Sequence, residues 1–489
     1  MSNNRELLIA LSPGEARWAL REAGRVVELG VERERAGPRS GEIVLARVRA
    51  VVPSANAAFL DLGGGQEGFL SGRDARHKLA PGFTAAASPE TDDIASLVNE
   101  GEALLVQIKR QAIGDKAAQV TAALALAGWR VVLTPGHAGI RLSRRITDAA
   151  ERERLTELAR DLAGGHDGEE AGLILRTAAA GADTDALTGE ANSLTARWGS
   201  LREAAAGAKA PAAVETAPTP LAAVLRDRAD LQPTRIQLDG RAGLAEAQAW
   251  LSAIEPGLTE RAEAAMGKRP LFEAEGIDDE FDAAFAAEVA LPGGGSLVIE
   301  PTAALVAVDV NTGGRTGKQG RAILETNLAA AKAVARQIRL RNLAGLIAVD
   351  FLRMRSANER DRVLAALRAA LAKTVPDAET GGFTRFGLVE IVRPRSRPAL
   401  HEALGEAVPG AGWRASAETV ALAALRSALR VAADAPGRPL RLRAAHDVIA
   451  ALRSTLKPAH GALEATLGLA VEMIGDPALG REDFDILPA

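Results

Sequence analysis

Three oxygen-bearing side chains stand near the ends of two apolar segments in the second half of the chain. Asp309 and Asn311 close the segment LVAVDVN, and Asp350 lies in GLIAVDF about 40 residues later, a separation that suits a strand–helix–strand unit. Such a unit returns its second strand parallel to the first, so both carboxylates should meet at one edge of a sheet, where open α/β sheets bind ligands. Neighbouring carboxylates repel each other unless a cation lies between them, and Mg²⁺ prefers oxygen ligands. The pattern therefore predicts a magnesium site.

The helix expected between these strands has a basic side and an apolar side. Its basic residues follow i, i+4, i+7 spacing: Lys332, Arg336 and Arg339. Its apolar stripe, suited to packing on a sheet, consists of Ala331, Ala335 and Ile338. Three more arginines alternate after a later strand: Arg393, Arg395 and Arg397. Spacing alone leaves two interpretations of these cations open, a nucleic-acid contact and a solvated surface.

Composition narrows the class of protein. The chain has 489 residues, 47% of them hydrophobic and 25% charged, which is ordinary for a folded protein of several domains. It contains no Cys, which excludes disulfides, thiolate zinc sites and a cysteine nucleophile. The net charge of −4 argues against coating nucleic acid through bulk charge, so any RNA or DNA site must use local basic surface. We find no signal peptide and no apolar run long enough to span a membrane, and we expect a cytoplasmic protein.

Changes in pattern divide the chain into segments. Residues 1–37 read as strand, helix (PGEARWALREAG) and strand, and residues 38–122 read as five short strands with glycine turns, typical of a small OB-type barrel. An Ala/Pro-rich stretch at 205–219 is typical of a linker, and VPGAGW at 408–413 reads as a second break. The remaining segments are mixed α/β: 123–204, 220–280, 281–407 and the tail to 489.

Two phenylalanines stand out inside the expected barrel because aromatic residues make up only 3% of the chain. Phe59 and Phe69 lie on either side of a glycine turn in AAFLDLGGGQEGFL, and Lys116 follows in a later loop. If the rings point outward, they would stack on unpaired bases while Lys116 meets phosphate. The alternative, equally compatible with the spacing, is that both rings fill the barrel.

Six ordered segments resemble the ribonuclease E/G family, bacterial endoribonucleases that cut single-stranded RNA to leave 5′-phosphate and 3′-hydroxyl ends. They are AAFLDLGGGQEGFL, LSRRI, GLILRTA, LPGGGSLVIEPTAALVAVDVN, ARQIRLRNLAGLIAVDF and TRFGLVEI. The resemblance implies an RNase-H-like subdomain split between 1–37 and 220–280, interrupted by an S1-like OB-fold barrel (38–122), a 5′-sensor subdomain (123–204) and the linker. A DNase-I-like catalytic subdomain (281–407) and a link with a small C-terminal domain (408–489) then follow.

The same resemblance assigns roles to residues. Asp309 and Asp350 would hold the catalytic Mg²⁺, with Asn311 beside them orienting the scissile phosphate or the attacking water. A pocket for a 5′-monophosphate matches Arg176 and Thr177, with Val132 packing nearby. The expected RNA contacts are Phe59, Phe69 and Lys116 in the barrel, Arg144 and Arg145 in LSRRI, and the charge-neutralising residues Lys332, Arg336, Arg339 and Arg385.

Three departures from the family pattern qualify these expectations. The chain lacks the CPxC motif through which larger members share a zinc between subunits, so no zinc link is expected, and a monomer and a zinc-independent homodimer both stay open. The loop after Asn311 is shorter and more basic than usual, and the chain ends soon after the small domain, without the long scaffold that recruits degradation partners. A catalytically inactive RNA-binding homologue is therefore one alternative. A nucleotide-binding enzyme is another, disfavoured because GGRTGKQG has Gln319 where a phosphate-binding loop needs Ser or Thr.

Overall fold

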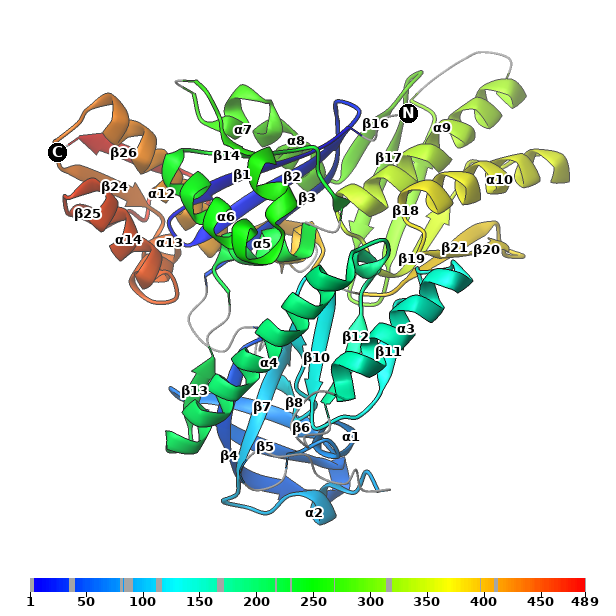
Figure 1. The fold of residues 1–489 in the computed structure, drawn as a ribbon. Coiled ribbons are helices and arrows are strands. Elements are labelled where there is room, and N and C mark those ends of the chain that lie inside the picture. Colours follow the sequence, from blue (N-terminus) through cyan, green and yellow to red (C-terminus); the bar gives the residue numbers. More distant parts are fainter. Residues whose placement is uncertain are drawn as a thin grey trace. The chain divides into compact units, whose positions relative to one another are not determined.

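The chain divides into two compact units, each described here by itself. The first comprises Met1–Glu34, Pro233–Ala247 and Glu260–Ala489, and the second comprises Arg35–Gln232 and Gln248–Thr259 (Figure 1). None of the helices within the described residues is both long and apolar enough to cross a membrane. The computed structural model describes residues 4–34, 40–79, 82, 91–110, 117–164, 171–215, 218–228, 231–267, 269–313, 319–395, 397–408 and 412–488.

A six-stranded sheet in the first unit contains both aspartate strands. Its strand order is β16 (Glu288–Leu291), β17 (Gly295–Pro301), β18 (Val306–Asn311), β19 (Gly345–Asp350), β21 (Leu388–Arg393) and β20 (Glu379–Phe383). β18 and β19 are neighbours and run parallel, connected by helix α9 (Gln319–Leu340). The predicted strand–helix–strand unit is therefore confirmed.

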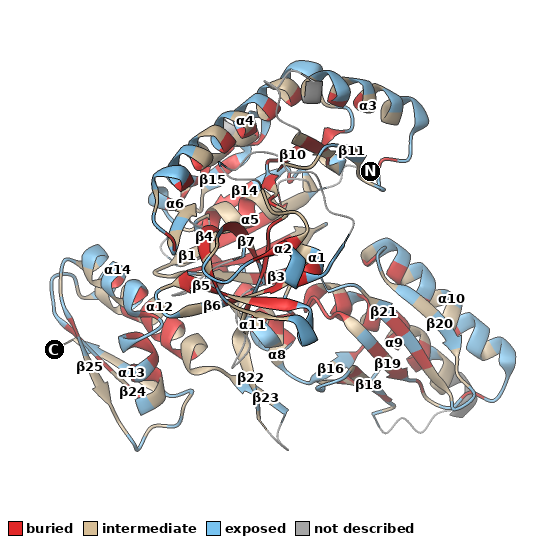
Figure 2. Cartoon of the chain, turned by 90° about the horizontal axis from the view of Figure 1, so that it is seen from below, coloured by how far each residue is buried: buried red, intermediate tan, exposed pale blue. Residues whose placement is uncertain are grey.

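One face of this sheet is covered by α9 and by α10 (Ala357–Thr374), which pack side by side (Figure 1). Side chains on a strand point alternately to the two faces. Buried valines and isoleucines from β18, β19 and β21 meet the apolar stripe of α9 in one core, as that stripe predicted: Val308, Val310, Ile347, Val349, Ile391, Ala331, Ala335 and Ile338. Buried residues run along these strands, whereas exposed residues cover the outer side of α10 (Figure 2).

A second sheet of this unit corrects one prediction. Its order is β15 (Ala262–Ala264), β14 (Arg235–Leu238), β1 (Arg5–Ser12), β2 (Glu15–Glu22) and β3 (Arg25–Arg33). The segment PGEARWALREAG was expected to be a helix, but Glu15–Glu22 is the middle strand of an antiparallel meander. Residues 15–20 are all buried, and Gly14 and Gly24 adopt positive φ in the flanking turns. Sheet pairing and two-sided burial thus override a helical propensity that is only a weak preference.

The rest of the first unit contains short helices and a small C-terminal α/β layer. The predicted break at 408–413 is part of a hairpin, β22 (Gly405–Val408) and β23 (Gly412–Ala415), with residues 409–411 outside the described chain. The helix α12 (Ala417–Asp434) follows the hairpin. The other elements are α7 (Leu271–Ala274), α8 (Ile277–Phe285), α11 (Leu400–Leu404), β24 (Leu440–Ala444), α13 (His446–Arg453), α14 (Lys457–Leu467), β25 (Val471–Gly475) and β26 (Phe484–Pro488).

A closed five-stranded barrel in the second unit confirms the OB-like expectation. The long strand β4 pairs with β5 on one side and β7 on the other, which closes the sheet. The stretch expected to be a linker is ordered at its middle, because β13 (Ala212–Glu215) pairs antiparallel with β4. The barrel elements are β4 (Ile43–Val52), β5 (Ala57–Gly63), β6 (Gln66–Ser71), β7 (Ala103–Arg110) and β8 (Ala118–Thr121), with short helices α1 (Gly72–Ala75) and α2 (Ile94–Leu97).

A four-stranded sheet completes the second unit. Its order is β11 (Ile140–Leu142), β12 (Ala171–Leu175), β10 (Val131–Pro135) and β9 (Leu126–Ala127). The helices α3 (Ala149–Gly164) and α4 (Thr184–Gly207) contribute buried leucines to the core beneath it. Helix α5 (Pro220–Arg228) also belongs to this unit, whereas α6 (Arg241–Ile254) spans the division between the two units.

Candidate functional site

Asp309 and Asp350 lie directly opposite each other on neighbouring parallel strands. In the β18–β19 register Asp309 pairs with Asp350, and both side chains are exposed. Neighbouring strands lie about 4.8 Å apart, and paired residues point to the same face. The structure therefore brings the two carboxylates together on the sheet face that α9 and α10 leave uncovered.

Asn311 belongs to the same cluster. It is exposed two residues after Asp309, and its side-chain amide donates a hydrogen bond of 3.0 Å to Asp309 Oδ2. The chain then turns at Gly313, where φ is +63° and any Cβ would collide with the Gly294 carbonyl. This close approach requires glycine and fixes the end of β18 against the β16–β17 turn. The side-chain oxygen of Asn311 stays available for a ligand.

The uncovered face is acidic. Besides the aspartates, Glu300 and Glu390 are exposed on it, opposite Ala307 and Ala348 of the two aspartate strands. RNA is a polyanion, so this face needs cations before a phosphate can approach. Within the described ranges, no group of three or more His, Cys, Asp or Glu side chains is arranged to hold a metal ion.

A divalent ion nevertheless fits the donor set. Mg²⁺ usually keeps several waters and is bound through one or two carboxylates together with substrate phosphates. Asp309 and Asp350 supply two such carboxylates in register, and the amide bond from Asn311 occupies only one of their oxygens. The two aspartates are thus the residues that would hold the ion, with Asn311 adjacent.

The basic stripe of α9 is not part of this cluster, which corrects the expectation for Lys332, Arg336 and Arg339. The helix has 22 residues, about 33 Å, and it must run from the end of β18 back to the start of β19. Residues 332–339 therefore lie in the layer on the opposite face, toward the far end of the strands. Lys332 is exposed there, and Arg336 contacts Glu280 at 3.4 Å.

Arg339 is already committed to carboxylates of the protein. Its guanidinium lies 2.9 Å from Glu22 and 3.0 Å from Glu28, and its side chain is only 14% exposed. Burial opposes the charge, but the hydrogen bond to Glu22 and the charge of Glu28 raise the pKa of Arg339 overall. This arginine fastens α9 to the five-stranded sheet through Glu22 of β2 and Glu28 of β3, so it is not available to contact RNA.

Three other arginines lie near the aspartates. Arg385, which sequence reasoning included, is exposed in the turn before β21, whose first residue Leu388 pairs with Asp350. Arg353 and Arg355 follow Asp350 in the chain and are also exposed, and sequence reasoning missed them. Their signal was present as two cations in LRMRS directly after the aspartate strand. The glycine-rich loop after Asn311 lies largely outside the described residues, at 314–318.

In the barrel, Phe59 and Phe69 point outward. They pair directly across β5 and β6, with ring centroids 5.8 Å apart in an edge-to-face arrangement. Each is half-buried, while the residues on either side of it in the strand are buried in the barrel core. The interpretation that they fill the barrel is therefore wrong. Lys116 lies outside the described residues.

A second candidate site lies at the end of β12. The Arg176 guanidinium donates to the Gly128 carbonyl at 3.0 Å, and the Thr177 hydroxyl lies 2.9 Å from the Ser143 hydroxyl. Arg144 and Arg145 are exposed beside Ser143. A guanidinium, two hydroxyls and two further cations can bind a terminal phosphate through charge-assisted hydrogen bonds. Sequence reasoning missed Ser143, although it stands in LSRRI.

A buried carboxylate, Glu190, holds the turn that contacts Arg176. Glu190 on α4 accepts hydrogen bonds from the backbone N–H groups of Arg130 and Val131, and its burial raises its pKa. This fixes the turn that presents the Gly128 carbonyl to Arg176. Val132, expected nearby, lies on β10 opposite Ile174 of β12 and is half-buried.

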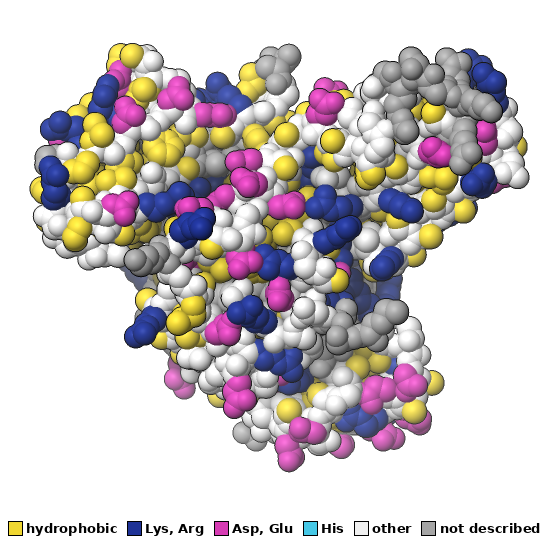
Figure 3. Space-filling view, turned by 90° about the horizontal axis from the view of Figure 1, so that it is seen from above, with side chains coloured by type: hydrophobic (Ala, Val, Ile, Leu, Met, Phe, Trp, Pro, Cys, Tyr) yellow, Lys and Arg dark blue, Asp and Glu magenta, His cyan; other side chains and the backbone are white. Residues whose placement is uncertain are grey.

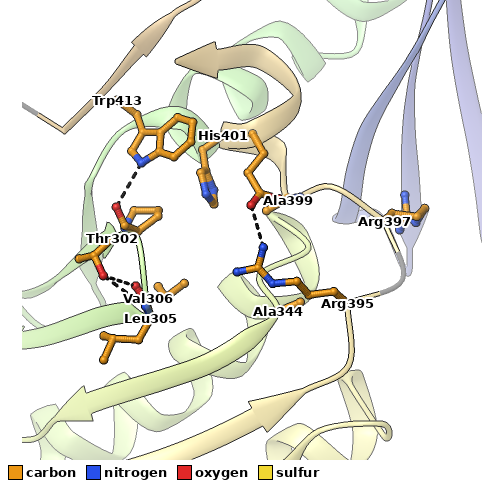
Figure 4. A pocket seen from close by; sticks show the side chains of 11 residues that line it. Thr302, Leu305, Val306, Ala344, Arg395, Arg397, Ala399, His401 and Trp413 are labelled. Carbon is orange, nitrogen blue, oxygen red and sulfur yellow. Dashed lines mark hydrogen bonds and ion pairs between the residues drawn. The ribbon is translucent and has the colours of Figure 1, made fainter. Parts of the chain in front are cut away.

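A small pocket of about 30 Å³ lies away from the aspartates, at the starting ends of β18 and β19 (Figure 4). His401 and Trp413 meet edge-to-face at 4.5 Å, and the Trp413 indole donates to the Pro301 carbonyl at 3.1 Å. Arg395 lies 3.1 Å from Glu402. Burial lowers the pKa of His401 to about 4, so its ring is neutral near pH 7. The volume suits a single water molecule. The pocket is lined by residues of the six-stranded sheet and of the β22–β23 hairpin.

Figure 3 shows that Lys and Arg side chains alternate with Asp and Glu side chains on the face viewed there, which agrees with the net charge of −4. Any affinity for a polyanion would therefore have to come from local clusters of Lys and Arg.

Comparison with known proteins gives consistent matches. The model of the ribonuclease E/G family matches residues 125–396. Ribonuclease G of Escherichia coli (strain K12) is 32% identical over 492 residues, covering 99% of each chain. Ribonuclease G of Haemophilus influenzae is 31% identical over 432 residues, 87% of each chain. Ribonuclease E of Escherichia coli (strain K12) is 32% identical over 431 residues, which cover 86% of this chain and 40% of that protein.

Proposed function

The chain belongs to the ribonuclease E/G family and is an endoribonuclease, and from this premise we propose that Asp309, Asp350 and Asn311 form a Mg²⁺-dependent centre that hydrolyses single-stranded RNA. The observation that carries the proposal is the register of β18 and β19, which pairs the two aspartates on an uncovered face. The family name supplies the substrate class, and the paired carboxylates supply the place where the phosphodiester would bind. We further propose that the products carry 5′-phosphate and 3′-hydroxyl ends.

The residues of the centre divide the work. The two carboxylates hold the ion, which when bound would polarise a phosphate oxygen and favour attack by water in line with the leaving 3′ oxygen. Asn311 orients the attacking water, which donates to its side-chain oxygen, or the scissile phosphate, which accepts from the second N–H of its amide, since the first N–H is held by Asp309. Arg385, Arg353 and Arg355 offset the negative charge of the phosphodiester at the edge of the sheet.

Two regions of the second unit are proposed to bind the same RNA. The outward rings of Phe59 and Phe69 stack on bases, and Lys116 contacts phosphate, as in an S1-like domain. Arg176, Thr177 and Ser143 bind a 5′-monophosphate, with Val132 beside the first nucleotide. Weak contacts on one strand raise each other's effective concentration, so the 5′ end and the cut site act together. We also propose that residues 1–37 with 220–280, 123–204 and 281–407 form RNase-H-like, 5′-sensor and DNase-I-like subdomains, respectively.

The test is cleavage of a short single-stranded RNA labelled at its 5′ end. We expect cleavage with Mg²⁺, none with EDTA, and products that a 5′-phosphate-dependent ligase can join without a kinase step. Cleavage that persists in EDTA, or products ending in a 2′,3′-cyclic phosphate, would refute the metal-and-water mechanism. Binding without cleavage under every metal condition would favour an inactive RNA-binding homologue.

A further inference from the structure

Phe386 presents an aromatic ring to solvent next to the proposed catalytic centre. Its side chain is 80% exposed in the turn between β20 and β21. Aromatic residues make up only 3% of the chain, and the other Phe and Trp side chains that the structure describes are buried or half-buried. An isolated exposed apolar residue needs no explanation by itself, so a function for Phe386 must be argued from the residues around it.

The turn that carries Phe386 is fixed by hydrogen bonds at both ends. Thr384 N–H donates to the Leu388 carbonyl at 2.8 Å, and Gly387 N–H donates to the Thr384 carbonyl at 3.0 Å. Leu388 N–H donates to the Thr384 hydroxyl at 3.2 Å, and Gly387 adopts a φ of +97° that favours glycine. A preorganised turn loses little conformational freedom when a ligand binds to the residues at its tip.

The turn lies beside the aspartates because of strand register. Leu388, the first residue of β21, pairs with Asp350, and Phe386 precedes it by two residues. Chain reach and strand spacing then place the Cα atoms of Phe386 and Asp350 within about 12 Å of each other. A base adjacent to a phosphate at the aspartates falls within this range. The exposed pair Leu346 and Val392 lies toward the other end of the same strands.

Arg385 completes the arrangement. Its guanidinium lies over the Phe386 ring, 4.6 Å from the centroid, which holds both side chains in one orientation and leaves the other ring face open. A ring paired with a cation matches a nucleotide, which offers a flat base and a negative phosphate. The exposed cations Arg353 and Arg355 follow Asp350 at the same sheet edge, so the local charge favours RNA over an apolar protein partner.

We propose that Phe386 stacks on the base of one nucleotide next to the scissile phosphate, while Arg385 contacts that nucleotide's phosphate. The inference rests on the proposed function, because it names the substrate contact of the same centre. Phe386 is a positioning residue for the substrate: it holds the strand so that the neighbouring phosphodiester lies at Asp309 and Asp350.

The first experiment compares Phe386→Ala, Phe386→Leu and Phe386→Trp on a short RNA. Loss of the stacking contact with one base, about 1–3 kcal/mol, should lower kcat/KM by about 5- to 150-fold for Phe386→Ala. Phe386→Trp should retain most activity, and Phe386→Leu, which keeps apolar bulk without a ring, should resemble Phe386→Ala. Met266→Ala is the matched control, since Met266 is 96% exposed in the same unit. Full activity of Phe386→Ala or Phe386→Leu would overturn the proposal.

A second experiment locates the base without relying on cleavage. RNAs carrying the fluorescent base 2-aminopurine at successive positions are bound to the Asp309→Asn variant. Stacking should quench one position next to the cut site, and adding Phe386→Ala should abolish the quenching at that position only. Unchanged quenching would reject the stacking contact even if the wild-type protein cleaves RNA. Failure of the wild-type protein to cleave, with quenching intact, would instead count against the proposed hydrolysis and support the base contact.

Discussion

The aspartate pair and the Arg176 pocket are built in different ways. Asp309 and Asp350 are short side chains that strand register alone places opposite each other. Arg176 and Thr177 instead depend on partners from three other segments: the Gly128 carbonyl, the Ser143 hydroxyl and, beneath the turn, Glu190. The first arrangement follows from backbone pairing, whereas the second is a network in which each member is positioned by another.

This difference predicts different responses to mutation. Removing a charge from the aspartate pair should abolish the chemistry without disturbing the fold, because among the described residues the hydrogen bond to these side chains comes from the exposed Asn311. Removing a member of the Arg176 network should have graded effects, since several groups share one ligand. The predictions below test that contrast, beginning with the largest expected effect.

The largest effect should come from Asp309→Asn. It removes one of two carboxylates available to the metal while preserving side-chain shape, so we expect kcat to fall by about 1,000-fold or more. RNA affinity should change little, because the other contacts stay in place. Single-turnover cleavage and filter binding on the same RNA measure both quantities.

The matched control is Asp361→Asn, an exposed aspartate on α10, in the layer on the other face of the same sheet. It should cleave like the wild-type protein. A variant Asp309→Asn that retains a tenth or more of wild-type activity would mean that the register pair is not the metal site.

Arg176→Ala should have the next largest effect. Loss of a charge-assisted hydrogen bond of about 1.5–3 kcal/mol corresponds to a decrease of about 10- to 150-fold in cleavage of 5′-monophosphorylated RNA. Cleavage of the same RNA with a 5′-hydroxyl should stay nearly unchanged. The ratio of kcat/KM values for the two RNAs is the measurement.

Arg160→Ala, which removes an exposed arginine from α3, is the control for nonspecific loss of charge. If Arg176→Ala slowed cleavage of both RNAs equally, this arginine would not recognise the terminal phosphate. Arg176 would then contribute to general RNA binding only, and the second site would not be a separate 5′-phosphate pocket.

The two sites also differ in how much of them was predictable. The aspartate pair was predictable because two apolar strands end in Asp309 and Asp350, about 40 residues apart. That separation by itself predicts a strand–helix–strand unit with parallel strands. Hydrogen bonds such as Arg176 to Gly128, or Ser143 to Thr177, join segments that no periodicity connects, so the Arg176 site came only from a family resemblance. Its supporting residues stayed hidden.

The errors have equally local causes. Periodicity identified a basic face on α9 but not its partners, so Arg339 was assigned to RNA although Glu22 and Glu28 hold it. The segment around Trp18 has helix-forming residues, yet it is buried on both sides within a sheet, a tertiary effect that local propensity does not contain. Phe386 was overlooked because only its 80% exposure distinguishes it from a core residue.

Low pH should lower the stability of the second unit, which contains Arg176, because His137 becomes protonated when this unit unfolds. Its ring packs edge-on against His77 at 4.2 Å, and burial, then the charges of His77 and Arg141, lower its pKa to about 4. The unfolded chain takes up a proton near pH 6.5, so stability is complete above that value and is lost as pH falls toward 4. Between pH 7 and 5 this amounts to about 2 kcal/mol.

Urea unfolding of the wild-type protein and of His137→Gln at both pH values measures this loss. The variant should lose about 2 kcal/mol less than the wild-type protein on acidification. His401→Gln provides the comparison in the other unit, because the pKa of His401 is also lowered to about 4. The core beneath the aspartates contains no histidine among its described members, so the geometry of Asp309 and Asp350 should not change when His137 is protonated. Parallel curves for wild type and His137→Gln would contradict the assignment.

The smallest effect is expected from Glu190, which supports Arg176 only indirectly, through the turn that contains Gly128. Glu190→Ala removes the acceptor that holds the N–H groups of Arg130 and Val131, so the turn presenting the Gly128 carbonyl should loosen. The preference for 5′-monophosphorylated over 5′-hydroxyl RNA should then fall by about 3- to 10-fold, the equivalent of one neutral hydrogen bond. Glu190→Gln keeps an acceptor oxygen and should retain most of the preference, and Glu157→Ala on the exposed side of α3 should retain all of it. If Glu190→Ala slowed both RNAs equally, Glu190 would stabilise the fold without orienting Arg176, and the Arg176 site would be as self-contained as the aspartate pair.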